Sequence, residues 1–292
     1  MKTGETPRMP TESGIIESGG FQLRYVIEGE GRPAIVIGSA IYYPRTFSQR
    51  LREHLRLVFM DHRGFAPEAR TTDTAAFELD LLLDDVERVR QELGLGRIVV
   101  IGHSGHAFMA LEYAKKYPQH VSHVVLIGAG PDYGEASSRA ADRYFEDLVA
   151  PERKATLERD LRLLPAEIEA APEKRFITFC VRLGARSWFD HDFDAAPLWE
   201  GVDVNMAMFD HVWGTVFRDI DIARGLDAFD KPVFLGLGLY DFLVPPHFTW
   251  NPLRSKFKDL TLRLFQRSGH TPQYEEPEAF DGELLGWLSR QG

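Results

Sequence analysis

Runs of hydrophobic residues in the first 130 positions alternate with segments of mixed polarity. Residues 21–28 (FQLRYVIE) alternate apolar and polar positions, which is typical of a half-buried strand. Short, continuously apolar runs predict further buried strands at residues 34–37, 57–60, 97–101 and 121–127. Apolar residues recurring every three or four positions predict helices at residues 45–54, 82–93 and 107–117. Strands that alternate with helices in this way predict a mostly parallel sheet with helices on both faces.

The alternation stops near residue 131. From there to about residue 225 no strand pattern appears, and residues 138–149 and 152–164 look helical. The strand pattern then resumes at residues 232–237 and 260–265, before a last helix at residues 276–289. We therefore expect one α/β core, residues 1–130 and 226–292, with a helical cap, residues 131–225, inserted after the sixth strand. Residues 1–13 look like a loose tail.

The segment IVVIGHSGHAFMALEYA, residues 98–114, joins a β-branched strand directly to a helix through Gly102-His103-Ser104-Gly105-His106. A strand, a G-x-S-x turn and a helix together form the nucleophile-elbow pattern, in which a tight turn raises the Ser hydroxyl above the sheet. His106 stands where the pattern usually has its last Gly. The alternative is that Ser104 only caps an ordinary strand–helix turn.

A serine hydroxyl needs a general base, and the base needs an acid that orients it. Asp241 follows the strand PVFLGL, and His270 follows the strand LTLRLF. The chain order Ser, Asp, His, with each residue behind its own strand, is the order expected for this elbow. We therefore predict a triad of Ser104, Asp241 and His270, with Asp132 as a second candidate for the acid and His103 as a packing residue.

The second half of an oxyanion hole should come from the loop after an earlier strand. That loop reads Gly38-Ser39-Ala40-Ile41-Tyr42. Ala40 is our first choice for a backbone donor to pair with the Gly105 N–H, and Ser39 is the second. A plain strand–loop turn is the alternative.

Residues near Ser104 and in the cap are candidates for the substrate pocket. We expect Ser39, Tyr42, His106, Trp188 and Trp213 to line it. His106 could face the substrate or bond the backbone, and the cap aromatics could equally serve to pack the cap onto the core.

Other polar residues of the cap have a less specific pattern. The cap carboxylates could capture a substrate ammonium or form a solvated face: Asp190, Asp192, Asp194 and Glu200. His191 lies between two of them, but the spacing matches no closed metal site, so no metal is expected. Cys180 has no partner motif and is expected to be a small buried hydrophobe.

The composition limits the cellular locations and the classes of binding partner that we expect. The formal charge is −10 without a basic block, so we do not expect nucleic acid as a partner. One cysteine excludes an intrachain disulfide, and neither a signal-peptide pattern nor a run of ~20 apolar residues is present. We expect a cytoplasmic protein without a membrane partner. A homo-oligomer is compatible with the sequence.

Four motifs together resemble those of the α/β-hydrolase superfamily: IVVIGHSGH, DHRGF (residues 61–65), GLYDFLVP (residues 238–245) and SGHTPQYEEPEAF (residues 268–280). Within it, the last motif and the helical insertion look most like the proline-iminopeptidase-like branch. The loop after residue 37 differs, because that branch carries His-Gly-Gly-Pro-Gly there. The resemblance implies an eight-stranded, mostly parallel sheet with a cap, the triad named above, and hydrolysis through an acyl-enzyme without a cofactor.

The resulting hypothesis is a serine hydrolase that acts on a small ester, amide or peptide, with a small molecule or short peptide as substrate. A proline-iminopeptidase-type aminopeptidase is the narrower version of it. A lyase or cofactor-free oxygenase on the same fold is the second hypothesis, kept open by His106. A ligand-binding protein with a vestigial triad is the third.

Overall fold

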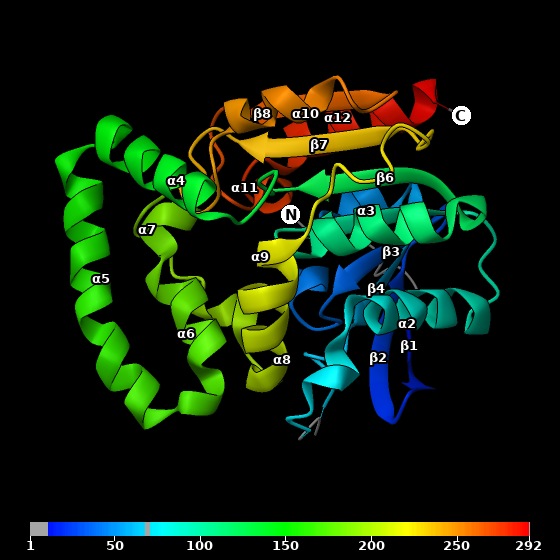
Figure 1. The fold of residues 1–292 in the computed structure, drawn as a ribbon, viewed down its shortest axis with the longest axis horizontal. Coiled ribbons are helices and arrows are strands. Elements are labelled where there is room, and N and C mark those ends of the chain that lie inside the picture. Colours follow the sequence, from blue (N-terminus) through cyan, green and yellow to red (C-terminus); the bar gives the residue numbers. More distant parts are fainter. Residues whose placement is uncertain (1–10, 68–70, 292) are drawn as a thin grey trace, which may run out of the picture.

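The computed structural model describes residues 11–67 and 71–291, and its centre is an eight-stranded sheet (Figure 1). The strands follow the order β1-β2-β4-β3-β5-β6-β7-β8. Only the pairs β1–β2 and β2–β4 are antiparallel, and β3 to β8 run parallel to β4. The strands are β1 (Thr11–Ser18), β2 (Phe21–Glu28), β3 (Arg32–Gly38), β4 (Leu55–Asp61), β5 (Ile98–His103), β6 (Val121–Ile127), β7 (Val233–Gly238) and β8 (Leu260–Phe265). The expected α/β-hydrolase architecture is confirmed.

Among the described strands, β1 is the one that the hydrophobic pattern did not predict. Its first three residues, 11–13, were expected to belong to a loose tail at residues 1–13. Residues 1–10 of that tail lie outside the described residues. The strand reads TESGIIES, so only Ile15 and Ile16 are apolar, and Ile15 is exposed. An edge strand that is bound mainly through its backbone ladder to β2 needs little hydrophobic alternation, which explains the weak signal.

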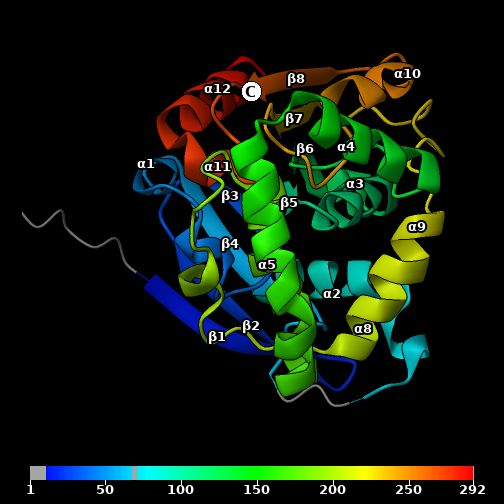
Figure 2. The same cartoon turned by 90° about the vertical axis from the view of Figure 1, so that its left-hand side faces the viewer.

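Helices cover both faces of the sheet. Figure 2 shows α2 (Leu79–Glu92) and α3 (His106–Lys116) on one side, and α1 (Gln49–Arg52) and α12 (Pro277–Arg290) on the other. The single helix predicted at residues 45–54 is wrong, because a short 3-10 turn, η1 (Tyr43–Arg45), ends before α1 begins. Ser48 caps α1 by accepting the Leu51 N–H at 3.1 Å, which separates the two turns.

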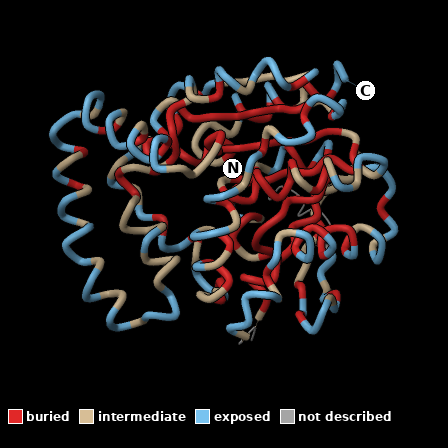
Figure 3. The backbone as a smooth tube through the Cα atoms, in the orientation of Figure 1, coloured by how far each residue is buried: buried red, intermediate tan, exposed pale blue. Residues whose placement is uncertain are grey.

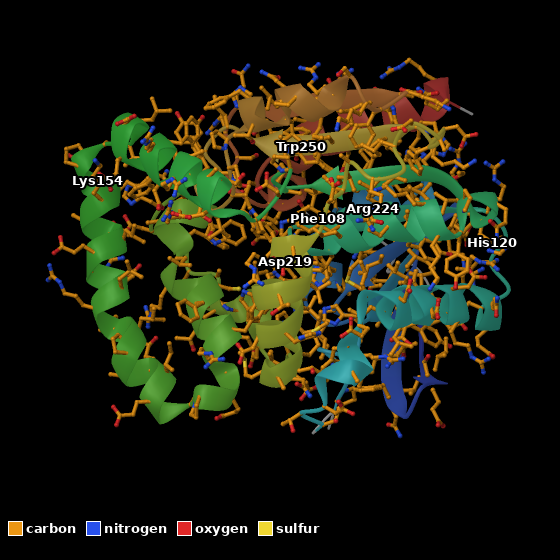
Figure 4. The ribbon with its side chains drawn as sticks, in the orientation of Figure 1. Phe108, His120, Lys154, Asp219, Arg224 and Trp250 are labelled. Atoms are coloured by element: carbon orange, nitrogen blue, oxygen red, sulfur yellow. The ribbon has the colours of Figure 1, made fainter. Side chains whose placement is uncertain are left out.

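Between β6 and β7 the described chain is helical and lies beyond the carboxyl ends of the parallel strands (Figure 1). We call residues 131–225 the cap. Its α-helices are α4 (Glu135–Leu148), α5 (Pro151–Ala170), α6 (Arg175–Arg182), α7 (Gly184–Ser187), α8 (Met206–His211) and α9 (Phe217–Asp219). Figure 3 shows that burial concentrates in the sheet and that α5 is largely exposed. Lys154 on α5 lies at this outer surface, paired with Glu146 (Figure 4).

Aromatic side chains join the cap to the core. The rings of Phe108 on α3 and Phe217 on α9 pack edge to face, with centroids 5.5 Å apart. Within the core, Trp250 lies in η7 (His247–Trp250), and its indole N–H donates to the Ala129 carbonyl, just after β6, at 2.8 Å. Figure 4 shows Phe108 between α3 and α9, and Trp250 beside β7. The cavity described below is lined by residues of both the core and the cap.

Candidate active site

Ser104 occupies a strained turn between β5 and α3. Its φ is +58°, a left-handed conformation that costs a non-glycine residue about 1–3 kcal/mol. The Ser104 N–H donates to the Ile127 carbonyl at 2.8 Å, which pins the turn to β6. A Cβ on Gly102 would lie 2.1 Å from the His106 carbonyl oxygen, so only glycine fits there. This is the local geometry that the elbow pattern predicts for a nucleophile.

The other two predicted triad members are hydrogen-bonded to each other. His270 Nδ1 lies 2.8 Å from Asp241 Oδ2, and both side chains are buried. The second Asp241 oxygen accepts the Leu243 N–H at 3.0 Å, which holds the carboxylate in place. Asp132, the rival acid, bonds the Gly134 N–H at 2.8 Å instead. Asp241 is therefore the carboxylate placed to orient His270.

Ser104 and His270 line the same cavity. Among the described residues no hydrogen bond links the Ser104 hydroxyl to the His270 imidazole, and the hydroxyl interacts with the side chain of Tyr133. Burial raises the pKa of Tyr133, so its phenol stays protonated at neutral pH. Hydrogen bonds between a nucleophile and its base often tighten only when substrate is bound, so this arrangement is compatible with a triad.

The backbone donors for an oxyanion differ from our first choice. The Ala40 N–H donates to Asp61 Oδ1 at 2.8 Å in the core, so it is not free to bind a substrate oxygen. Burial raises the pKa of Asp61 to about 6, although its ion pair with Arg24 opposes that shift. Ser39, our second choice, lines the cavity, and within the described chain neither its N–H nor that of Gly105 has a hydrogen-bond acceptor. Ser39 and Gly105 are thus the better pair.

His106 belongs to a buried chain of hydrogen bonds. Gly64 N–H donates to His62 Nδ1 at 2.9 Å, which leaves the proton of neutral His62 on Nε2. His62 Nε2 lies 2.9 Å from His106 Nε2, so His106 carries its own proton on Nδ1, 2.9 Å from the Tyr43 hydroxyl. Burial lowers the pKa of His106 to about 3 and that of His62 well below its usual range. Both rings are therefore neutral at physiological pH.

The chain continues to the predicted base. Tyr43 Oη is 3.3 Å from His103 Nδ1, and His103 Nε2 donates to the His270 carbonyl at 2.8 Å. Burial holds the pKa of His103 well below its usual range, so this ring is neutral too. His103 is more than a packing residue, because its proton supports the backbone of His270. His106 has both ring nitrogens engaged, which weakens the case for it as a base in lyase or oxygenase chemistry.

The cavity above Ser104 measures about 400 Å³. All the residues predicted to line it do so: Ser39, Tyr42, His106, Trp188 and Trp213. Other lining residues are mostly aromatic or aliphatic: Tyr43, Phe65, Tyr133, Phe176, Phe179, Leu183, Trp199, Leu243 and Val244. Cys180 also lines the cavity, and burial raises the pKa of its thiol to about 12. No Asp, Glu, Lys or Arg is found in this lining among the described residues.

The cap carboxylates lie elsewhere. Asp190, Asp192, Asp194 and Glu200 are exposed and do not line the cavity. Asp190 and Asp194 accept backbone N–H groups of their own loops. No cluster of three or more potential metal ligands occurs in residues 11–67 and 71–291. Over the same residues, no helix combines the length and apolar character needed to cross a membrane.

The fold, the cavity and the hydrogen-bonded pair of His270 and Asp241 are typical of one class of protein, the α/β hydrolases. Residues 30–277 match the family model for the alpha/beta hydrolase fold, and the chain belongs to this family. The AB hydrolase superfamily protein YclE of Bacillus subtilis is 44% identical over 278 residues, covering 95% of this chain and 99% of that protein.

Two solved structures share the fold at low sequence identity. The proline iminopeptidase of Mycobacterium smegmatis superposes with a TM-score of 0.72 at 18% identity, covering 96% of this chain and 98% of that one. The esterase EaEST of Exiguobacterium antarcticum gives a TM-score of 0.67 at 18% identity, covering 94% and 98%. At this identity the likeness concerns the fold, and the relatives include both peptidases and esterases.

Several residues of the site had no distinguishing sequence signal. His62 lies in the DHRGF motif, but nothing in that motif places it beside Ser104; His62 and Tyr43 lie far from Ser104 along the chain, and only the sheet topology brings them to the elbow. Phe176, whose ring stacks on Phe209 with centroids 3.9 Å apart, comes from a cap helix whose placement no motif indicates. Glu275 was visible only as part of the EEPEAF motif.

Proposed function

We propose that the protein is a serine hydrolase that cleaves a small, uncharged carboxylic ester through an acyl-enzyme. The observation that carries the proposal is the placement of an elbow serine and an Asp-bound histidine around one apolar cavity. Ser104 is at the strained turn, and His270 Nδ1 lies 2.8 Å from Asp241. The family assignment supports a hydrolase in general terms.

In the acylation step, Ser104 Oγ forms a bond to the ester carbonyl carbon while its proton passes to His270 Nε2. Asp241 keeps the other imidazole proton on Nδ1 and stabilises the imidazolium that forms. The tetrahedral intermediate collapses when the C–O bond to the alcohol breaks, and His270 returns the proton to the departing alkoxide. Water, activated by the same imidazole, then releases the acid from Ser104.

The negative charge on the carbonyl oxygen would be bound by the backbone N–H groups of Gly105 and Ser39. Gly105 is the N-cap of α3, where the helix dipole favours an anion. Removing one donor from such a hole typically costs about 10²–10³ in kcat. The chemistry requires no cofactor.

The uncharged cavity favours an ester over an aminoacyl substrate. An aminopeptidase must hold a substrate ammonium, and an ammonium buried without a carboxylate is strongly disfavoured. No carboxylate lines the cavity among the described residues, whereas aromatic rings from the core and the cap do. We therefore place a neutral, apolar acyl group of moderate size in it.

A substrate panel tests the proposal. We expect p-nitrophenyl butanoate and hexanoate to be hydrolysed with kcat/KM values at least about 100-fold above those for prolyl and alanyl p-nitroanilide. Ser104→Ala is the background control. A higher kcat/KM on an aminoacyl anilide would contradict the assignment. Tight binding of an ester without turnover would instead indicate a ligand-binding protein.

A further inference from the structure

The loop that carries His270 is bound to a carboxylate that the proposed reaction does not use. Glu275 ends α11 (Pro272–Glu275), and its Oε2 accepts the N–H groups of Gly269 at 3.0 Å and Thr271 at 3.1 Å. These two residues flank His270 on either side. The carboxylate therefore fixes the backbone from which the imidazole projects.

The other oxygen of the same carboxylate reaches the cap. Glu275 Oε1 accepts the Phe189 N–H at 2.7 Å. One residue earlier, Trp188 is buried and lines the cavity, and so does Ser187. A single side chain is thus bonded both to the loop of the predicted base and to the cap segment that walls the substrate cavity.

Direct backbone contacts reinforce this junction. The His270 N–H donates to the Ser187 carbonyl at 2.5 Å. A Cβ on Gly269 would lie 2.2 Å from that carbonyl oxygen, so the two segments meet without intervening side chains. From the cap side, the buried guanidinium of Arg153 donates to the carbonyls of Trp188 and Phe189 at 2.7 and 2.5 Å. In this cap segment, the carbonyls of Trp188 and Phe189 thus accept from a cation, and the Phe189 N–H donates to an anion.

We propose that Glu275 is a positioning residue that ties residues 187–189 of the cap to residues 269–271, so that the substrate wall and His270 hold a common geometry. The functional half of this inference rests on the proposed role of His270 as the base. The three accepted N–H groups belong to two segments that the chain separates by about 80 residues, so the carboxylate does more than close its own loop. Charge-assisted bonds of this kind are roughly twice as strong as neutral ones.

The ionised form is the one that can accept all three bonds. Burial raises the pKa of Glu275 to about 7, against the lowering effect of the N–H groups of Phe189, Gly269 and Thr271. Asp241 raises that pKa further through charge repulsion. The measurement therefore belongs at pH 8, where the carboxylate is charged.

The test compares Glu275→Gln with Glu276→Gln by amide hydrogen exchange at pH 8. Glu276 is the matched control, because it also accepts from the loop, at Arg267 N–H and Ser268 Oγ, but within the described chain it has no hydrogen bond to the cap. A glutamine at 275 can turn its oxygen to only one side, so the other side faces an NH₂ group. Because the proposal has the two segments hold each other in place, the loss on either side should raise exchange about tenfold in peptides covering both 187–189 and 269–271, the effect of losing one charge-assisted hydrogen bond. Glu276→Gln should leave the cap peptide unchanged.

Kinetics supply the second readout. With His270 and the cavity wall decoupled, Glu275→Gln should lower kcat/KM on p-nitrophenyl hexanoate about 10- to 100-fold. Glu276→Gln should stay within about threefold of wild type. Should Glu275→Gln fail to fold, Glu275→Asp takes its place, because the shorter side chain keeps the charge but cannot reach both segments.

Three results would overturn the proposal. Unchanged exchange at 187–189 in the Glu275 variant is one, and an equal rise in the Glu276 variant is another. Faster exchange with unaltered kcat/KM is the third. Hydrogen exchange does not depend on turnover, and labelling of Ser104 by a fluorophosphonate checks the hydrolase assignment separately, so the two claims can fail independently.

Discussion

The two walls of the cavity are built in different ways. On the sheet side, His62, His106, Tyr43 and His103 form an unbroken chain of hydrogen bonds that ends on the His270 carbonyl. On the cap side, hydrogen bonds hold the segment of residues 187–189, and the rest of the wall consists mainly of aromatic rings in contact with one another, as Phe176 is with Trp199 and Trp213. Even the buried indole N–H of Trp188 has no hydrogen-bond partner among the described residues.

This difference indicates that the two walls have different roles: the sheet side positions the catalytic groups, and the cap side selects the substrate. Hydrogen bonds with fixed tautomers allow one arrangement, which suits a base that must lie within tenths of an ångström of its target. Ring contacts depend on area and tolerate sliding, which suits a wall that accommodates an acyl group. We expect changes on the sheet side to lower kcat and changes on the cap side to alter KM and substrate preference.

The largest expected effect comes from the acid that orients the base. Asp241→Asn should lower kcat/KM on p-nitrophenyl butanoate about 10³- to 10⁴-fold, because the amide stabilises the wrong imidazole tautomer. The circular-dichroism melt should stay close to that of wild type. Asp132→Asn is the control and should remain within about threefold. A larger loss for Asp132→Asn would reverse the assignment of the acid.

Breaking the sheet wall should affect both stability and rate. Tyr43→Phe removes the hydroxyl that links His106 to His103 and leaves the buried Nδ1 of His103 without a partner in the described chain, whereas His106 Nδ1 keeps the His103 carbonyl at 3.2 Å. We expect a loss of about 1–3 kcal/mol in the free energy of unfolding, measured in urea. The value of kcat should fall about tenfold at nearly constant KM. Tyr117→Phe, which removes an exposed hydroxyl bonded to Asp84, should change neither. A KM effect alone in Tyr43→Phe would contradict the division of roles.

Changing the cap wall should shift preference instead. Trp213 packs on His106 with ring centroids 5.4 Å apart, and its indole fills the space that a side chain at Gly105 would need. Trp213→Leu should raise KM for the hexanoyl ester about tenfold and leave the acetyl ester within about twofold, since only the longer acyl group reaches it. Equal losses on both esters would mean that Trp213 supports the elbow and not the acyl group.

The smallest effect is expected from the cap carboxylates. The triple change of Asp190, Asp192 and Asp194 to Asn should leave kcat/KM on both esters and aminoacyl anilides within about twofold, because these side chains are exposed and outside the cavity. A selective loss on the anilides would restore the idea that they capture an ammonium.

Much of the fold could be predicted because the hydrophobic periodicity of the strands and helices was clear and the turns between them were marked by glycine and proline. The parallel strands are short apolar runs, and Ser104, Asp241 and His270 each follow one of them, so the chain order alone grouped them. The edge strand β1 was not predicted, because it is paired to β2 through its backbone and has few apolar residues to form a pattern. The helix predicted at residues 45–54 is longer than the observed α1, because the Ser48 cap that begins α1 leaves no gap in the hydrophobic pattern.

Parts of the site could not be predicted from the sequence, because they depend on contacts across the sheet. Ala40 was favoured as an oxyanion donor for its small size, but the carboxylate of Asp61, 21 positions away, takes its N–H. The role of His106 depends on His62 and Tyr43, which reach it only through strand order β4-β3-β5. Glu275 acts on the cap through one backbone N–H that no motif marks.

The measurement that tests the central claim most directly is the intact mass of the protein after treatment with a fluorophosphonate, on wild type and on Ser104→Ala. A serine activated by His270 and Asp241 should give a single adduct on wild type, located at Ser104 by peptide mapping, and none on the variant. No adduct on the folded wild-type protein, or an equal adduct on Ser104→Ala, would contradict the assignment of Ser104 as the nucleophile.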